Sequence, residues 1–255
     1  FSKNVLESFK TDSRDFHVVT DLGGGFANEL DKTLGDNWIV LDHHQIPDEE
    51  LDNPNVINSW KYGIDGGADI CSGGMAYLAS EALDERNSDL SALAIVSALG
   101  DRQDQGERKS FTGKNFEIAN TAKDLGLVEI DLDLLLVGRE TRPLADALAF
   151  TSQPFIEGLT WNREACFSLL KSSGVNLKEE GRWRVPAELN EEEKKQVIES
   201  ITKYASGKNA TELMSELIGY TYTFPREDNR SFLRDGREFS TMLNSCGRIN
   251  RSGVG

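Results

Sequence analysis

The sequence predicts an α/β fold in which a parallel sheet is flanked by helices. Residues 16–20 (F-H-V-V-T) and 38–41 (W-I-V-L) are short apolar runs, typical of buried strands. Residues 27–34, between them, have the composition of a short helix. Strand, helix and strand in this order form a β-α-β unit, whose strands pair in parallel. Ligands of such sheets bind at the carboxyl ends of the strands.

Helices are expected over much of the remaining chain. Residues 70–83 and 90–100 are apolar enough to form buried helices, and the second one ends at Asp101. The polar residues 101–110 are typical of a loop. Asn190, followed by three glutamates, predicts the capped start of a helix over 190–205. Further predictions are helices at 114–125, 143–150, 163–172 and 231–244, and a strand at 216–224 with Leu217, Tyr220 and Tyr222.

Composition limits the class of protein. The chain has 255 residues, of which 38% are hydrophobic, enough for the core of one large domain or of one domain and part of another. No apolar run approaches the ~20 residues of a membrane helix, so no membrane partner is expected. The three cysteines are widely spaced, which favours reduced thiols and a cytoplasmic location. A net charge of −15 argues against a broadly basic nucleic-acid surface, but leaves a local basic groove open.

Chemistry-bearing residues follow the predicted elements. Asp21 ends the first strand, Asp42, His43 and His44 end the second, and Asp101 ends a helix. The chain has only three histidines, and side chains alternate along a strand, so these two neighbours cannot both point into a core. Carboxylate and imidazole together suit Mn²⁺, Zn²⁺ or Fe²⁺. A turn or helix cap remains the alternative for Asp21 alone, and a structural role for either histidine.

Six segments carry a resemblance to a known family. T-D-L-G (20–23), L-D-H-H (41–44) and A-L-G-D-R-Q-D (98–104) resemble motifs of the DHH phosphoesterase superfamily. V-G-R-E-T-R-P-L (137–144), P-F-I-E-G-L-T-W-N (154–162) and L-R-D-G-R-E-F-S-T-M-L-N-S-C-G-R (233–248) resemble its archaeal RecJ-like branch of single-strand exonucleases. The resemblance implies a DHH domain over 1–150, a helical connector over 151–212 and the start of a smaller α/β DHHA1 domain over 213–255.

The resemblance also implies a catalytic site. Asp21 would bridge two Mn²⁺ ions, for which Mg²⁺ is a possible substitute, and His43 and Asp101 would ligate one of them. Asp42 would orient the histidines, and His44 would contact the scissile phosphate. A metal-activated water would then hydrolyse the phosphodiester bond.

Five arginines are candidates for substrate binding. Arg102, Arg139 and Arg142 could bind phosphate oxygens as planar forks, or form ordinary salt bridges. Arg248 and Arg251 lie in C-G-R-I-N-R-S-G-V-G, which resembles the beginning of the DHHA1 substrate-binding motif. There, contact with a phosphate chain and a plain disordered tail are both open.

Two departures from the family pattern affect these expectations. The family's first motif should lie well upstream of Asp21, and the twenty preceding residues contain no such motif. Asp12 and Asp15 precede the strand, so they are expected at its opposite end. Because the chain begins at Phe1 and stops inside the DHHA1 motif, we expect a fragment cut at both ends, with weak or no activity and at most one partly occupied metal site.

Three functions remain after this reading. The first is a metal-dependent exonuclease acting on single-stranded DNA or RNA. The second is a small-molecule phosphodiesterase or pyrophosphatase. The third is a replisome scaffold without catalysis, because RecJ relatives include a eukaryotic replication-fork protein without metal motifs and archaeal proteins that associate with GINS.

Overall fold

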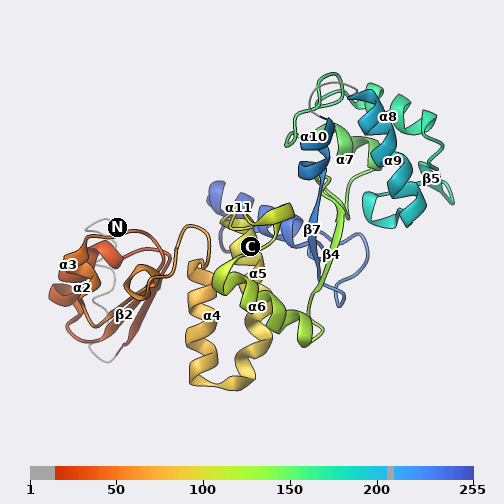
Figure 1. Cartoon of the computed structure of the whole chain (residues 1–255). Coiled ribbons are helices and arrows are strands. Elements are labelled where there is room, and N and C mark those ends of the chain that lie inside the picture. Colours follow the sequence, from red (N-terminus) through yellow and green to blue (C-terminus); the bar gives the residue numbers. More distant parts are fainter. Residues whose placement is uncertain (1–14, 206–209) are drawn as a thin grey trace. The chain divides into compact units, whose positions relative to one another are not determined.

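The computed structural model describes residues 15–205 and 210–255, and these form two compact units (Figure 1). Unit 1 contains the described residues up to Gly106 and residues 111–125. Unit 2 contains residues 107–110 and the chain from Gly126 onward. Each unit has its own hydrophobic core and is described separately.

Unit 1 begins with a three-stranded parallel sheet. Its strands β1 (His17–Thr20), β2 (Trp38–Asp42) and β3 (Val56–Asn58) pair in the order β1-β2-β3, and α2 (Ala27–Leu34) connects the first two. The predicted β-α-β unit and the α/β class are therefore confirmed. The third strand was not predicted, because three residues are too few to show a pattern.

The core of this sheet forms around its central strand. Trp38 and Val40 of β2 are fully buried against Ala27 and Leu30 of α2. Successive strand residues point to opposite faces, so Leu41 packs into a second cluster with Ile70 and Met75. A short helix, α3 (Asp48–Leu51), separates β2 from β3.

Three helices complete unit 1: α4 (Ser72–Leu83), α5 (Ser91–Gly100) and α6 (Gly113–Asp124), with α5 packed against both others (Figure 1). The helices predicted at 70–83, 90–100 and 114–125 are confirmed, with starts displaced by one or two residues. The α4 start is set by Cys71, whose sulfur accepts a hydrogen bond from the Gly74 N–H group. The predicted loop after Asp101 is also present, apart from a short 3-10 turn at Glu107–Lys109.

Unit 2 combines an antiparallel strand pair with a group of helices. The pair is β4 (Glu129–Leu134) and β7 (Ile218–Thr223), and a small hairpin consists of β5 (Lys178–Glu179) and β6 (Arg182–Trp183). The helices are α7 (Leu144–Phe150), α8 (Arg163–Ser172), α9 (Glu191–Tyr204), α10 (Ala210–Leu217) and α11 (Gly236–Arg248). Asn190 caps α9 as predicted, in a capping box with Glu193.

The core of unit 2 joins residues from distant parts of the chain. Its fully buried members include Leu144 and Leu148 of α7, Leu170 of α8, Ile201 of α9 and Leu217 of α10. The domain boundaries that the resemblance implies, after residues 150 and 212, both fall inside this unit. Helices on both sides of each boundary share one core.

Three local predictions in unit 2 were wrong or incomplete. The strand expected at 216–224 begins at Ile218, because Leu217 packs into the helical core as the last residue of α10. The helix expected from Ser231 begins at Gly236, because the Asp235 carboxylate caps the N–H groups of residues 237 and 238. Strand β4 was missed, although its E-I-D-L-D-L sequence alternates as an exposed strand does.

Candidate metal centre

The parallel sheet brings the predicted site residues to one edge. Thr20 pairs with Leu41, so Asp21 and the Asp42-His43-His44 segment leave the sheet side by side. Asp101 arrives from the end of α5. His43 Nε2 lies 3.3 Å from Asp21 Oδ1 and 3.7 Å from Asp101 Oδ2. The three residues predicted to ligate one metal therefore meet in the fold. Of the two upstream aspartates, Asp15 immediately precedes β1, on the side away from Asp21, and Asp12 lies outside the described residues.

The His43 ring is held by the backbone of a distant loop. Its Nδ1 atom lies 2.5 Å from the Gly66 carbonyl oxygen. A carbonyl oxygen can only accept, so Nδ1 carries a proton and donates it. In the neutral ring, the lone pair is then on Nε2, which faces the two carboxylates. This is how proteins commonly orient a histidine that ligates a metal.

Asp42 organises the opposite side of the site. Its side chain is 3% exposed, and Oδ1 accepts hydrogen bonds from the His44 N–H group at 3.1 Å and from His44 Nδ1 at 2.8 Å. Oδ2 accepts from the Gly24 N–H group at 3.0 Å, in the segment after Asp21. Asp42 thus orients His44, whereas Gly66 orients His43. The His44 side chain is 57% exposed, so its Nε2 edge is open to a ligand.

Backbone geometry supports these contacts. Asp21 has φ 68°, a left-handed conformation that is uncommon for a residue with a side chain and is concentrated at functional sites. Gly66 is required by close approach, because a Cβ atom there would lie 1.8 Å from the His43 carbonyl oxygen. At Gly24 a Cβ atom would lie 2.9 Å from Asp42 Oδ2.

The site has a strongly negative field. Burial alone would lower the pKa of His43, but the Asp21 carboxylate, the Gly66 carbonyl and the Asp101 charge together raise it to about 9. The close approach of the His43 ring lowers the pKa of Asp21. Burial raises the pKa of Asp101, and the neighbouring Asp21 charge adds to this effect. A field that holds a proton on His43 Nε2 would also favour a divalent cation at this atom.

These residues fit a divalent cation. Ligand atoms of Asp21, His43 and His44 lie within 4.8 Å of one another, and Asp101 reaches the same His43 nitrogen. His43 Nε2 is buried and makes no hydrogen bond of good geometry among the described residues. A mixed carboxylate and imidazole set matches the preferences of Mn²⁺, Zn²⁺ and Fe²⁺. The resemblance implied that His44 contacts the scissile phosphate, and its place in this cluster makes it a further candidate ligand.

Comparison with protein families gives a match in unit 2. Residues 136–218, in unit 2, match the DHH-CID domain. This match supports membership of the DHH superfamily. It also suggests a DHH-family phosphoesterase, in agreement with the D-H-H motif of unit 1. Comparison with curated proteins finds no match.

The five predicted arginines differ in their surroundings. Arg102, the one in unit 1, is exposed and has φ 56°. Arg139 lies in the DHH-CID region, where its 13% exposed side chain pairs with Asp133 at 2.6 Å and Glu140 at 3.3 Å. These contacts are those of a structural ion pair. Arg248 and Arg251, near the end of the chain, are exposed.

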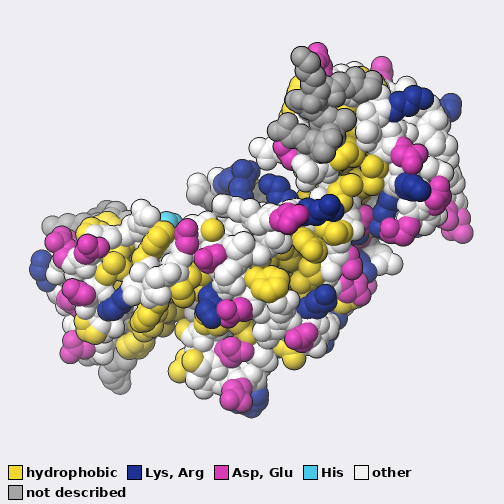
Figure 2. Space-filling model, viewed as in Figure 1, with side chains coloured by type: hydrophobic (Ala, Val, Ile, Leu, Met, Phe, Trp, Pro, Cys, Tyr) yellow, Lys and Arg dark blue, Asp and Glu magenta, His cyan; other side chains and the backbone are white. Residues whose placement is uncertain are grey.

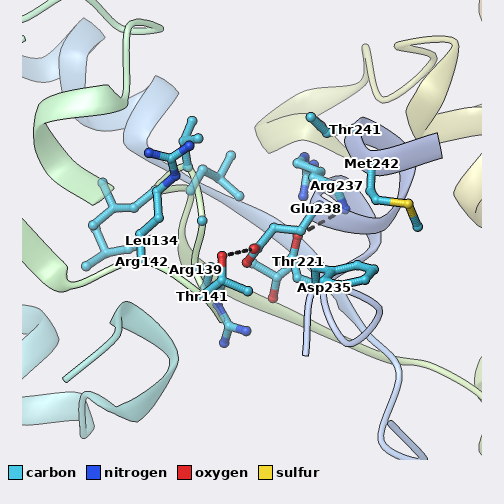
Figure 3. Close-up of a pocket in the computed structure, with 15 residues that line it drawn as sticks. Leu134, Arg139, Thr141, Arg142, Thr221, Asp235, Arg237, Glu238, Thr241 and Met242 are labelled. Carbon is cyan, nitrogen blue, oxygen red and sulfur yellow. Dashed lines mark hydrogen bonds between the residues drawn. The ribbon is translucent and has the colours of Figure 1, made fainter. Parts of the chain in front are cut away.

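Arg142 and Arg139 both line a cavity of about 310 Å³ within unit 2 (Figure 3). Leu134 at the end of β4, the two leucines that follow it and Met242 of α11 contribute to its apolar walls. Glu238 of α11 accepts hydrogen bonds there from the Thr141 hydroxyl and the Glu140 N–H group. The Arg142 guanidinium lies 4.7 Å from the centre of the Phe150 ring.

Three residues close to the site were not predicted from the sequence. Gly66 holds His43, and the buried side chains of Gln103 and Asn115 form a hydrogen-bonded chain behind it. Gln103 lies inside the motif that contains Asp101, which is the only sequence signal for it. Nothing in the sequence near Asn115 marks a site.

Surface character agrees with the composition. On the face that Figure 2 shows, acidic side chains are spread widely and Lys and Arg are interspersed among them. No helix among the described residues has both the length and the apolar character needed to cross a bilayer.

Proposed function

We propose that unit 1 binds a divalent cation through Asp21, His43 and Asp101, and that the chain hydrolyses phosphodiester bonds. Mn²⁺ is the expected ion and Mg²⁺ a possible substitute. The observation that carries the proposal is the position of His43 Nε2 near the Asp21 and Asp101 carboxylates. The other ring nitrogen, Nδ1, donates its proton to the Gly66 carbonyl, so Nε2 is the nitrogen left for a cation. The DHH-CID match supports the phosphoesterase class.

The protein residues divide the chemical work. A bound divalent cation supplies Lewis-acid chemistry, lowering the pKa of water and polarising a phosphate oxygen. Asp42 keeps the Nδ1–H group of His44 engaged, so His44 can contact a ligand only through Nε2. This atom is an acceptor in the neutral ring and donates to a phosphate oxygen only in the doubly protonated ring. Because Asp42 also bonds to the Gly24 N–H group, it keeps His44 in register with the segment after Asp21.

Single-stranded nucleic acid is the proposed substrate, in the manner of a RecJ-like exonuclease. Its support comes from exposed aromatic rings in the DHH-CID region. Trp161 is 66% exposed, its ring packs edge-on against Phe150 at 6.0 Å, and the Arg142 guanidinium covers Phe150. Arg142 has no carboxylate partner among the described residues. Unpaired bases stack on exposed aromatic rings and arginines, and stacking does not depend on sequence.

A hydrolysis assay tests the proposed function. The chain is incubated with Mn²⁺ and labelled single-stranded DNA or RNA, and in parallel with short oligonucleotides, a cyclic dinucleotide and pyrophosphate. We expect weak, Mn²⁺-dependent cleavage of single strands by the wild-type chain and none by His43→Ala. Asp36→Asn, which removes an exposed acid elsewhere in unit 1, is the control and should be as active as the wild type. Cleavage of pyrophosphate or the cyclic dinucleotide alone would replace the nuclease proposal with the small-molecule one.

The aromatic rings allow a separate test of substrate class. Trp161→Ala should weaken binding of single-stranded DNA by about 1–3 kcal/mol, the usual cost of losing one stacked base. Trp183→Ala is the control, because the Trp183 ring is already covered by the Lys178 ammonium group at 4.1 Å. If both variants bind single-stranded DNA with equal affinity, base stacking on Trp161 no longer supports the proposed substrate.

Association with GINS stays a prediction. A pull-down with purified GINS tests it independently of catalysis, using His43→Ala beside the wild-type chain. Capture of both would indicate that replisome binding and metal binding are separate properties of the chain.

A further inference from the structure

Gln103 is fully buried between the candidate metal ligands and α6. Its Nε2 atom lies 2.8 Å from the Gly66 carbonyl oxygen, 2.9 Å from Asp101 Oδ2 and 3.2 Å from the Ile70 carbonyl oxygen. Its Oε1 atom accepts a hydrogen bond from Asn115 Nδ2 at 2.6 Å. A buried amide is costly unless paired, and this one is paired at both ends.

The surroundings allow only one orientation of this amide. Nε2 faces two carbonyls and a carboxylate, which accept hydrogen bonds, and His43 Nδ1 lies farther away, at 3.5 Å, whereas Asn115 offers a donor to Oε1. A flipped amide would put Oε1 against three acceptors and leave Asn115 facing an NH₂ group. Asn115, on α6, therefore determines which way Gln103 points.

The same amide contacts both sides of His43. Gly66, whose carbonyl accepts from His43 Nδ1, also accepts from Gln103, and a carbonyl oxygen has two lone pairs for this purpose. Asp101, whose carboxylate approaches His43 Nε2, accepts from Gln103 as well. The Gln103 side chain thus links the Gly66 carbonyl, which orients His43, to the Asp101 carboxylate, which faces His43 Nε2.

We propose that Gln103 is a positioning residue for the candidate metal centre, with Asn115 fixing the direction of its amide. The proposal rests on the proposed function, because it assigns the Asp21, His43 and Asp101 cluster to a cation. Gln103 has no contact with the cation. It acts by holding the Gly66 carbonyl and the Asp101 carboxylate in place. Partners of this kind usually affect metal affinity by about 10- to 100-fold.

Mn²⁺ binding measured by calorimetry tests the proposal. Gln103→Met keeps the length of the side chain and removes both hydrogen-bonding ends. It should weaken Mn²⁺ binding by about 10- to 100-fold while the circular dichroism spectrum stays that of the wild type. Gln105→Met is the matched control. Gln105 lies in the same loop as Gln103, but it is exposed and bonds to the carbonyl of Gly67, the residue after Gly66, at 3.3 Å. Wild-type Mn²⁺ affinity in a folded Gln103→Met chain would overturn the proposal.

Asn115→Asp provides a second variant in case Gln103→Met fails to fold. It keeps the shape of Asn115 but replaces the donor that faces Gln103 Oε1 by an acceptor, which should repel Oε1 and displace the amide. We expect the same direction of loss in Mn²⁺ affinity. An unchanged affinity in this variant would count against the proposal, whatever its thermal stability.

A readout without metal separates this proposal from the proposed function. In the metal-free chain, the His43 Nδ1 proton bonded to Gly66 should give a downfield NMR signal protected from exchange. Gln103→Met should broaden this signal, and Gln105→Met should not. If the wild-type chain binds no Mn²⁺, the proposed function fails, while the Nδ1 signal still decides whether Gln103 positions His43. A sharp signal in both variants would overturn the positioning role.

Discussion

The two units surround their clustered carboxylates with different partners. In unit 1, the ion pairs of Asp21, Asp42 and Asp101 within the described residues are all with histidines. In unit 2, the partners are arginines: Asp133 and Glu140 pair with Arg139, Glu188 with Arg230, and Glu193 with Arg184. The same residue types thus form a negative site in one unit and neutral ion-pair networks in the other.

The partners of the carboxylates therefore distinguish a candidate metal site from a structural ion-pair network, which the presence of carboxylates alone does not. A carboxylate close to an arginine has its charge compensated, and breaking the pair costs stability. Carboxylates gathered around a histidine without arginine or lysine keep a field that attracts a cation. Four predictions test this contrast.

The largest expected effect is on the stability of unit 2. Arg139→Met leaves two nearly buried carboxylates, Asp133 and Glu140, without their main partner. Breaking buried pairs costs about 3–5 kcal/mol. We expect the lower end in urea unfolding, since Lys194 still reaches Asp133 at 3.1 Å. Mn²⁺ affinity should not change. The exposed Arg226→Met is the control. A stable Arg139→Met chain with reduced DNA affinity would favour a phosphate-binding role for Arg139.

The mirror-image change in unit 1 should affect binding more than stability. Asp21→Asn removes a carboxylate that is favourable to His43 and repels Asp101, so these opposing effects should leave a smaller stability change in urea unfolding than Arg139→Met does. Mutation of a residue that only hydrogen-bonds to a metal ligand usually lowers metal affinity by about 10- to 100-fold. Loss of Asp21 should therefore weaken Mn²⁺ binding by more than about 100-fold in calorimetry. Tight Mn²⁺ binding by this variant would place the cation elsewhere.

A smaller effect is expected at the loop that holds His43. Gly66→Ala places a Cβ atom 1.8 Å from the His43 carbonyl oxygen, so the backbone must move. Such overpacking usually costs about 1–3 kcal/mol. Both the free energy of unfolding and the Mn²⁺ affinity should fall. Gly67→Ala is the control, because its Cβ would meet only the Asp65 side chain, at 3.2 Å. Equal behaviour of the two variants would contradict the close approach.

The smallest expected effect is a pH dependence in unit 2. Burial raises the pKa of Glu238 above its usual value of 4.5. An acid with a raised pKa in the folded state stabilises the fold at low pH and loses this contribution as the pH rises through the folded pKa. Glu238→Gln removes this dependence. Relative to the variant, the wild-type chain should lose a small part of its stability as the pH rises above 4.5 in urea unfolding. An unchanged difference would contradict the raised pKa.

Local sequence patterns predicted most elements. Apolar runs located β1 and β2, and the Asn190 cap with Glu193 located the start of α9, because these signals act between residues close in the chain. Predictions were wrong where a contact from farther away decided. Leu217 joined a helix because the core of unit 2 surrounds it, although its own neighbours favour a strand.

The sequence by itself determined that Asp21, Asp42, His43 and His44 end neighbouring parallel strands, since a β-α-β unit can place them only at one edge. Only the tertiary structure decided which atoms form hydrogen bonds with these side chains. Gly66 reaches His43 across 23 residues, and Gln103 reaches Gly66 across 37. It also decided that Arg139 pairs with Asp133. Such contacts depend on how whole elements pack, and a buried polar group finds its partner only once that packing exists.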